Sequence, residues 1–210
     1  MTSVAVSVVA LGLVWGEKRS QEPVFDLSKF QPYAAGVGDG DYKIAPPYAN
    51  APELTPNGSV PKGQVFHFVM ESTDSKIYPG ISKYASGTVP YHRRVTVYVP
   101  SQYRPGTPAP FLVSQDSLGS GEIPTILDNM IAAHRLPAMV AVLIDSGGSD
   151  SKGSERGLEY DEVSGKYAYF IETEVLPRAA KETGVTFSKD PDARMIMGGS
   201  SGAACAFTAA

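Results

Sequence analysis

The chain has 210 residues, of which 42% are hydrophobic and 10% aromatic, which is enough for one substantial hydrophobic core. Its formal net charge is −4, and charges of both signs are scattered along the sequence, so we expect neither a nucleic-acid partner nor a membrane surface as partner. A single cysteine excludes an intrachain disulfide framework, and with only three histidines the sequence predicts no zinc site.

Residues 1–16 begin with an apolar, uncharged run. The run is short for a transmembrane helix and has the length of the hydrophobic part of a signal peptide, although no basic residue precedes it and no clean cleavage motif follows. We therefore predict a signal peptide, and with it a secreted or periplasmic protein. The alternative is a buried first strand, which the valine-rich composition favours and which would leave the protein cytoplasmic.

Residues 17–62 are polar and interrupted by Pro, Gly, Tyr and Asn, with no sustained period of 2 or 3.6 residues. This pattern predicts an irregular N-terminal arm or linker. The Gly-x-Gly pattern at Gly36–Gly40 follows no expected strand and opens no expected helix, so we interpret it as a loop and not as a dinucleotide site. The main domain is expected to span residues 63–210.

The first regular elements are two alternating, β-branched runs, Gln64–Met70 and Arg93–Val99. Both have the period of 2 that is typical of strands, and Pro100 ends the second. We predict that they form an antiparallel pair at one side of a sheet.

After Pro100 the pattern changes to short apolar runs that alternate with helical patterns. The alternation predicts a mostly parallel sheet covered by helices on both faces, which is a three-layer α/β sandwich. The expected strands are 110–114, 137–144 and 194–197, and the expected helices are 123–133, 161–181 and 202–210.

Gly198-Gly199-Ser200-Ser201-Gly202 lies between the last expected strand and the last expected helix. In this context the motif predicts a nucleophile elbow, a sharp strand-to-helix turn that exposes a serine hydroxyl in strained backbone geometry. Gly198 and Gly202 leave the room that such a turn needs, and Ala203 and Ala204 are expected to let the helix approach the sheet. Ser200 is therefore the predicted nucleophile, and the N–H of Ser201 is a predicted oxyanion donor.

The same residues are also similar to the glycine turn of short-chain dehydrogenases. In that family the turn follows the first strand of the domain and carries a glycine where this chain has Ala204. Here two strand–helix units come first, so a nucleotide cofactor is disfavoured. A phosphate-binding loop is excluded because no lysine follows the glycines.

Several stretches together resemble the enterochelin-esterase-like branch of the esterase D type of α/β-hydrolases. The resemblance covers about residues 63–210. It is carried by the stretches Arg94–Pro100, Ser114–Asp116, Pro124–Asn129 and Ser154–Asp161, and by the segment from Gly198 to Ala210.

The resemblance implies ester hydrolysis through an acyl-enzyme on Ser200, with no metal and no organic cofactor. It implies a small-molecule ester substrate of the siderophore or acylated-sugar type. The family commonly has Gln-Asp-Gly after the first central strand, where this chain has Gln115-Asp116-Ser117, so the backbone N–H of Ser117 is the expected second oxyanion donor. Asp116, Arg156 and Glu159 are expected to line a substrate pocket.

In α/β-hydrolases the acid and the histidine follow the serine in the chain. Neither residue type occurs after Ser200. His67 and His134 are expected to have structural roles, and His92 lies on an outer strand about three strand spacings of ~4.8 Å from the elbow. We therefore expect a serine carboxylesterase whose last strands, acid and histidine lie beyond residue 210. The alternative is a non-catalytic, truncated relative that binds an ester or a sugar.

Overall fold

The computed structural model describes residues 46–80, 86–117, 119–148 and 154–210. The chain divides into two units, residues 1–48 and 49–210, and the fold described below is that of the second unit. The predicted signal peptide lies outside the described residues. Within the described ranges, no helix has both the length and the apolar character needed to cross a membrane.

A five-stranded mixed sheet forms the centre of this unit, with the strand order β1-β2-β5-β4-β7. The strands are β1 (Gln64–Glu71), β2 (His92–Val99), β4 (Phe111–Gln115), β5 (Val140–Ile144) and β7 (Arg194–Met197). β1 and β2 pair antiparallel, and β2 also runs antiparallel to β5. β4 runs parallel to both β5 and β7. The predicted antiparallel pair and the mostly parallel remainder are confirmed.

The burial of each strand follows its sequence pattern. All five residues of β4 and all five of β5 are buried, as expected for central strands covered on both faces. In β2, Val95 and Val97 point to one face and Thr96 and Tyr98 to the other. Arg93 has the same parity as the two valines and is buried with them.

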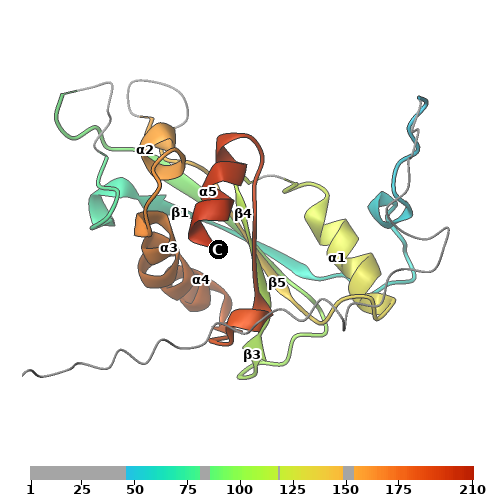
Figure 1. Ribbon diagram of the computed structural model, residues 1–210. Coiled ribbons are helices and arrows are strands. Elements are labelled where there is room, and N and C mark those ends of the chain that lie inside the picture. Colours follow the sequence, from blue (N-terminus) through green and yellow to red (C-terminus); the bar gives the residue numbers. More distant parts are fainter. Residues whose placement is uncertain (1–45, 81–85, 118, 149–153) are drawn as a thin grey trace, which may run out of the picture. The chain divides into compact units, whose positions relative to one another are not determined.

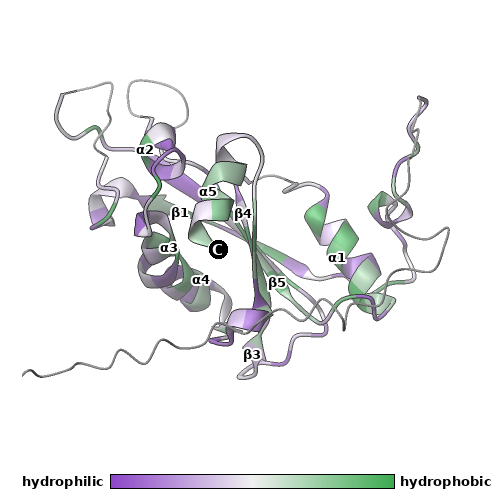
Figure 2. Ribbon diagram, viewed as in Figure 1, coloured by the Kyte–Doolittle hydropathy of each residue, from purple (hydrophilic) through white to green (hydrophobic). Residues whose placement is uncertain are grey.

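Helices cover the two faces of the sheet unequally (Figure 1). One face carries α1 (Ile123–Ala132), whose Ile123, Leu127 and Ile131 pack against Leu112 and Leu143. The other face carries the remaining helices: α2 (Arg156–Tyr160), α3 (Lys166–Phe170), α4 (Leu176–Thr183) and α5 (Ser201–Ala209). Figure 2 shows hydrophobic residues on β4, β5 and α1, where the layers meet.

The long helix expected over residues 161–181 is different in the structure. The helical segment starts at Lys166 and runs as α3, a π-helical turn at Ile171–Val175 (η4) and then α4, which ends at Gly184 in the left-handed region (φ 72°). Pro177 lies just after the π-helical turn, inside the continuous helical segment, where a proline removes one backbone hydrogen bond. Residues 156–160 form the separate short helix α2, which sequence periodicity did not reveal because five residues are too few for a periodic pattern.

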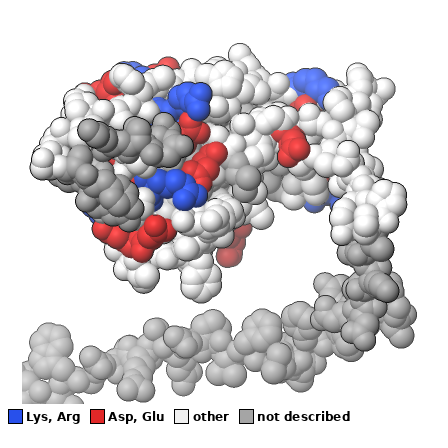
Figure 3. All heavy atoms as spheres, turned by 90° about the horizontal axis from the view of Figure 1, so that it is seen from above, with Lys and Arg blue, Asp and Glu red and all other residues white. Residues whose placement is uncertain are grey.

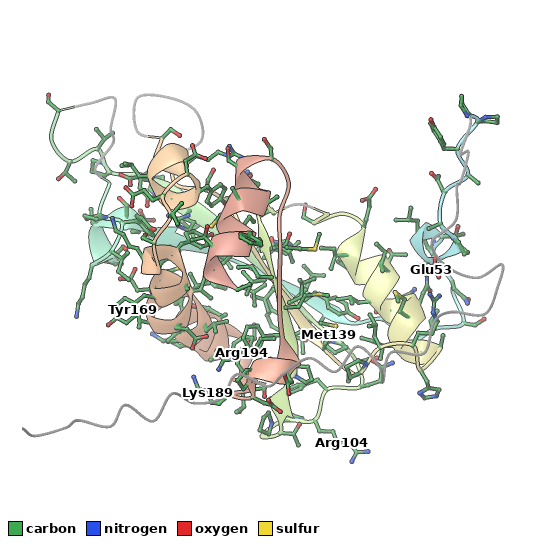
Figure 4. The ribbon with its side chains drawn as sticks, viewed as in Figure 1. Glu53, Arg104, Met139, Tyr169, Lys189 and Arg194 are labelled. Carbon is green, nitrogen blue, oxygen red and sulfur yellow. The ribbon has the colours of Figure 1, made fainter. Side chains whose placement is uncertain are left out.

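The compact unit begins at Ala49 and so includes part of the expected arm. The 3-10 turn Pro52–Leu54 (η2) packs on α1, because the Asn129 side chain donates hydrogen bonds to the carbonyls of Glu53 (2.8 Å) and Thr55 (3.0 Å). Glu53 also forms an ion pair with Arg135, and Figure 4 shows it beside α1.

Short elements complete the unit. β3 (Pro108–Ala109) and β6 (Thr186–Phe187) pair in a separate two-stranded parallel sheet, and 3-10 turns lie at Ser72–Asp74 (η3) and Pro191–Ala193 (η5). The Asp190 side chain caps η5 by accepting the N–H of Asp192. This turn leads the chain directly into β7 and so to the predicted elbow.

Candidate active site

The backbone turns sharply between β7 and α5, at Ser200. Ser200 has φ 55° and ψ −127°, outside the regions that L-residues normally occupy, and it is exposed to solvent. A Cβ on Gly198 would lie 2.2 Å from the Gly202 carbonyl oxygen, and a Cβ on Gly202 would lie 3.2 Å from the Gln115 Cβ. The turn therefore requires glycine at position 198, and glycine at position 202 lets α5 approach β4.

The close approach of α5 does not involve Ala203 and Ala204, contrary to the sequence-based expectation. Both alanines are exposed, whereas Gly202, Cys205 and Ala206 are buried against the sheet. Cys205 is 2% exposed, and burial raises the pKa of its thiol to about 12, which leaves it an inert core residue at neutral pH.

Ser201 is the first residue of α5, and its N–H makes no hydrogen bond within the described part of the chain. The first N–H groups of a helix lack intrahelical partners and carry a partial positive charge. The Ser201 N–H is therefore in a position to stabilise negative charge that develops beside the Ser200 hydroxyl.

The loop after β4 approaches the same turn. Asp116 (φ 56°) and Ser117 (φ 48°) are both in the left-handed region that favours glycine. Ser117 stands at the position of the glycine in the Gln-Asp-Gly pattern. Asp116 donates its N–H to the Tyr160 hydroxyl at 3.2 Å. Ser117 donates its N–H to the Ile144 carbonyl at 3.2 Å, so in this conformation that N–H is not free to bind an oxyanion.

Asp116 and Arg156 form an ion pair beside the elbow. Arg156 Nη2 lies 2.7 Å from Asp116 Oδ2, and this oxygen lies 3.4 Å from the position of a Cβ on Gly202. The guanidinium carbon of Arg156 lies 5.1 Å from the centre of the Tyr160 ring, which adds a cation–π contact. Both side chains of the pair are about one-third exposed, so they can meet a ligand at this edge.

Glu159 was expected in the pocket, but the structure places it elsewhere. Its side chain is fully buried, with both carboxylate oxygens bound to the guanidinium of Arg93 and within 3.2 Å of the Gly147 N–H. Burial alone would lower the pKa of Arg93, but the charge of Glu159 and its hydrogen bonds raise it by a larger amount, so Arg93 stays charged. Glu159 therefore anchors α2 and does not face a ligand.

The three histidines lie away from Ser200. His67 is in the outermost strand β1, where Nδ1 lies 3.0 Å from Thr96 Oγ1. His92 begins β2, three strand positions from β7, and Nδ1 lies 2.5 Å from a carboxylate oxygen of Glu71. His134 is exposed after the end of α1. His67 is exposed.

Other acidic residues at this edge are paired or solvated. Asp145 follows β5, binds Arg94 Nε at 2.8 Å and accepts a hydrogen bond from the Ser117 hydroxyl. Asp161 is exposed after α2. Seen from above, Lys and Arg alternate with Asp and Glu, without a field of one sign (Figure 3). Over the described ranges, no three metal-ligating side chains lie together.

Comparison with known families places this chain among esterases. The Esterase family model, described as "Putative esterase", matches residues 86–210, more than half of the chain. The chain belongs to this esterase family. A comparison with curated proteins gives no match.

Solved structures show the same fold. The enterobactin esterase from Shigella flexneri, solved with 2,3-dihydroxy-N-benzoyl-serine, is 19% identical to the 210-residue chain over 75% of that chain's length, with a TM-score of 0.52. The ferric enterobactin esterase from Salmonella typhimurium is 20% identical over 68% of the 210-residue chain, with a TM-score of 0.50. The chain spans only 34% and 32% of these two structures' own lengths. The predicted α/β-hydrolase fold and the predicted esterase family are confirmed.

Sequence reasoning missed the buried polar groups beneath the esterase's elbow. Tyr160 accepts the Asp116 N–H, and the Tyr167 hydroxyl lies 3.5 Å from Gln115 Oε1. Arg93 joins this layer from β2. A signal for Arg93 was present, because its parity with Val95 and Val97 places it on a buried face. The helical spacing over residues 161–181 likewise places Tyr167 on the buried side, whereas no pattern showed that Tyr160 would bind Asp116.

Proposed function

We propose that the chain carries the nucleophile of a serine carboxylic ester hydrolase, and that this nucleophile is Ser200. The observation that carries the proposal is the backbone of Ser200, φ 55° and ψ −127°, between β7 and α5 with glycine on both sides. Strained backbone at an exposed serine has a functional explanation here, because it presents the hydroxyl at the N-terminus of a helix.

The mechanism follows from this placement. The Ser200 hydroxyl oxygen attacks the ester carbonyl and its proton passes to a base, which gives a tetrahedral oxyanion beside the Ser201 N–H. The alcohol leaves with that proton, and an acyl-enzyme on Ser200 remains. Water then attacks the acyl carbonyl and gives its proton to the base, which passes it to the Ser200 oxygen as the carboxylic acid leaves. No metal or organic cofactor takes part in this scheme.

The base in this proposal is a histidine oriented by an aspartate or glutamate, as in other serine hydrolases. His67, His92 and His134 do not fit the role, because each lies on an element remote from the elbow or is paired elsewhere. We therefore propose that the acid and the histidine come from residues other than the described ones. The Ser117 N–H can serve as second oxyanion donor only if it gives up its hydrogen bond to Ile144.

The proposed substrate is a small ester of the siderophore or acylated-sugar type. The exposed cation of Arg156, held by Asp116 next to the elbow, supports a substrate with an acidic or hydroxyl-rich group near the scissile bond. A related fold solved with 2,3-dihydroxy-N-benzoyl-serine makes a phenolic acyl group one reasonable choice for an assay. The signal peptide over residues 1–16 remains part of this proposal.

The test compares two adjacent serines in the protein expressed from its complete coding sequence. With p-nitrophenyl acetate, Ser200→Ala should lower kcat/KM by about 10³-fold or more, because the nucleophile is lost. Ser201→Ala should retain most activity, since only the backbone of Ser201 takes part. Hydrolysis that survives Ser200→Ala would overturn the assignment.

The alternative is a non-catalytic relative that binds an ester or a sugar. It predicts that the wild type and both serine variants show no turnover. A bound ester or sugar should still raise the melting temperature of all three proteins. Loss of that ligand-induced shift in Arg156→Ala would favour binding without catalysis. Turnover that depends on Ser200 would exclude it.

A further inference from the structure

One buried acidic residue beside the site has no role in the mechanism above. Glu155 directly precedes α2, is 1% exposed, and does not cap the helix with its side chain. Its Oε1 is buried and has no hydrogen-bond partner among the described residues. A buried carboxylate oxygen without a partner is costly, so this group requires an explanation.

The charges around Glu155 do not balance if it is ionised. Arg93 of β2 uses Nη1 for Glu159 and the Asp145 carbonyl, and Nη2 for Glu159 and the Tyr91 hydroxyl. Two carboxylates of one segment thus share a single buried cation, and only Glu159 is bound to it. Among the described residues, Lys166 of α3 also acts on Glu155, and its Nζ lies 4.9 Å from the centre of the Tyr78 ring.

A proton on Glu155 removes this imbalance. Burial, the largest cause, and the neighbouring charge of Glu159 together raise the pKa of Glu155 from 4.5 to about 7, against the opposing charges of Arg93 and Lys166. The phenol of Tyr91 faces the same group and stays neutral, because burial raises its pKa as well. The packed arrangement therefore favours the neutral acid.

The backbone of the same residue links α2 to the sheet edge. Glu155 donates its N–H to the Gly147 carbonyl at 2.7 Å, and Gly147 in turn lies against the Glu159 carboxylate. The next residue, Arg156, reaches Asp116 beside the elbow. Figure 1 shows α2 next to the first turn of α5, so any displacement of α2 moves Arg156 relative to Ser200.

We propose that Glu155 is a positioning residue, and that its proton keeps α2 packed on the sheet so that Arg156 stays beside the elbow. The packing of α2 is then strongest below the ordinary pKa of 4.5, weakens as the pH rises to about 7, and weakens no further above it. The link to catalysis rests on the proposed function, whereas the protonation and the packing do not.

The first test measures unfolding by urea at pH 5, 6, 7 and 8. Glu155→Gln keeps the shape and removes the titration, and Glu162→Gln is the matched control because Glu162 is exposed nearby. Between pH 5 and pH 7 the wild type and Glu162→Gln should lose stability relative to Glu155→Gln, by a factor that approaches tenfold in the unfolding constant per pH unit. Equal pH dependence in all three proteins would overturn the proposal.

The second test reports on Arg156 itself and needs no activity. In ¹⁵N-labelled protein the side-chain Nε–H signal of Arg156, assigned with Arg156→Lys, should shift with pH in the wild type and stay constant in Glu155→Gln. A ¹³C titration of the wild-type Glu155 carboxyl gives its pKa even if the variant does not fold. A midpoint near 4.5, or an Arg156 signal that ignores Glu155, would overturn the proposal, and neither result bears on Ser200.

Discussion

The cores on the two faces of the sheet differ in composition. Under α1 the core is mainly aliphatic, with Leu112, Leu127 and Leu143 at its centre, and the buried Asp128 accepts hydrogen bonds from Tyr98 and Gly63. Under α2–α5 the core holds a buried ion pair, Arg93–Glu159. Four buried tyrosines lie in or beside that second core: Tyr78, Tyr91, Tyr160 and Tyr167.

This difference follows the position of the candidate site. The polar groups under α2–α5 connect β2, the end of β5 and α2, which are the segments that place Arg156 and Asp116 beside Ser200. Directional hydrogen bonds define one arrangement of these segments, whereas aliphatic packing tolerates substitution more readily. We infer that one face mainly supplies stability and the other mainly supplies the geometry of the site.

The largest effect is expected from breaking the buried ion pair. Arg93→Met should lower the free energy of unfolding by about 3–5 kcal/mol, because the buried carboxylate of Glu159 loses the cation that balances its charge. The measurement is urea denaturation at pH 7. Arg94→Met is the matched control on the same strand, since Arg94 is 81% exposed and its pair with Asp145 should contribute about 0–1 kcal/mol.

The double variant Arg93→Met, Glu159→Leu sharpens the comparison. It removes both charges, so most of the lost stability should return while the Arg156 position is no longer defined. If the double variant were as active as the wild type, the polar face would not be needed for site geometry.

An intermediate effect is expected on the aliphatic face. Leu143 is fully buried, so Leu143→Ala should lower the free energy of unfolding by about 2–5 kcal/mol, through lost burial and the cavity that remains. Leu143→Met conserves volume and should cost less than about 1.5 kcal/mol. The pH dependence of stability should be unchanged in both, and a changed pH dependence would mean that the two faces are coupled.

Most of the fold could be predicted from the sequence because its signals are local. The solid apolar runs of β4 and β5, the alternation in β1 and β2, and the strand–glycine–helix order around Ser200 each arise from neighbouring residues. The errors came where a pattern was too short or was overridden. α2 has five residues, and the π-helical turn in residues 171–175 shifts the periodicity of the expected long helix.

The candidate site was predictable only in part. The backbone of the elbow agrees with the glycine pattern, since the space at Gly198 and Gly202 is a local property. Glu159 was misplaced because its partner, Arg93, is 66 residues away and no local pattern connects them. The N–H of Ser117 turns to Ile144 for a similar reason, since only the packed loop decides where it points.

The smallest effect is expected at the hydrogen bond between Tyr98 and Asp128 on the aliphatic face. The Tyr98 hydroxyl donates to Asp128 Oδ1 at 2.7 Å, and the Gly63 N–H donates to the same oxygen at 2.8 Å. Tyr98→Phe should therefore lower the free energy of unfolding by only about 1–2 kcal/mol, because Asp128 keeps a second donor and is not left unpaired. Asp128→Ala removes the acceptor of both donors and should cost more. If Tyr98→Phe proved as damaging as Arg93→Met, polar burial would be equally important on both faces, and the division between a stabilising face and a site-forming face would be wrong.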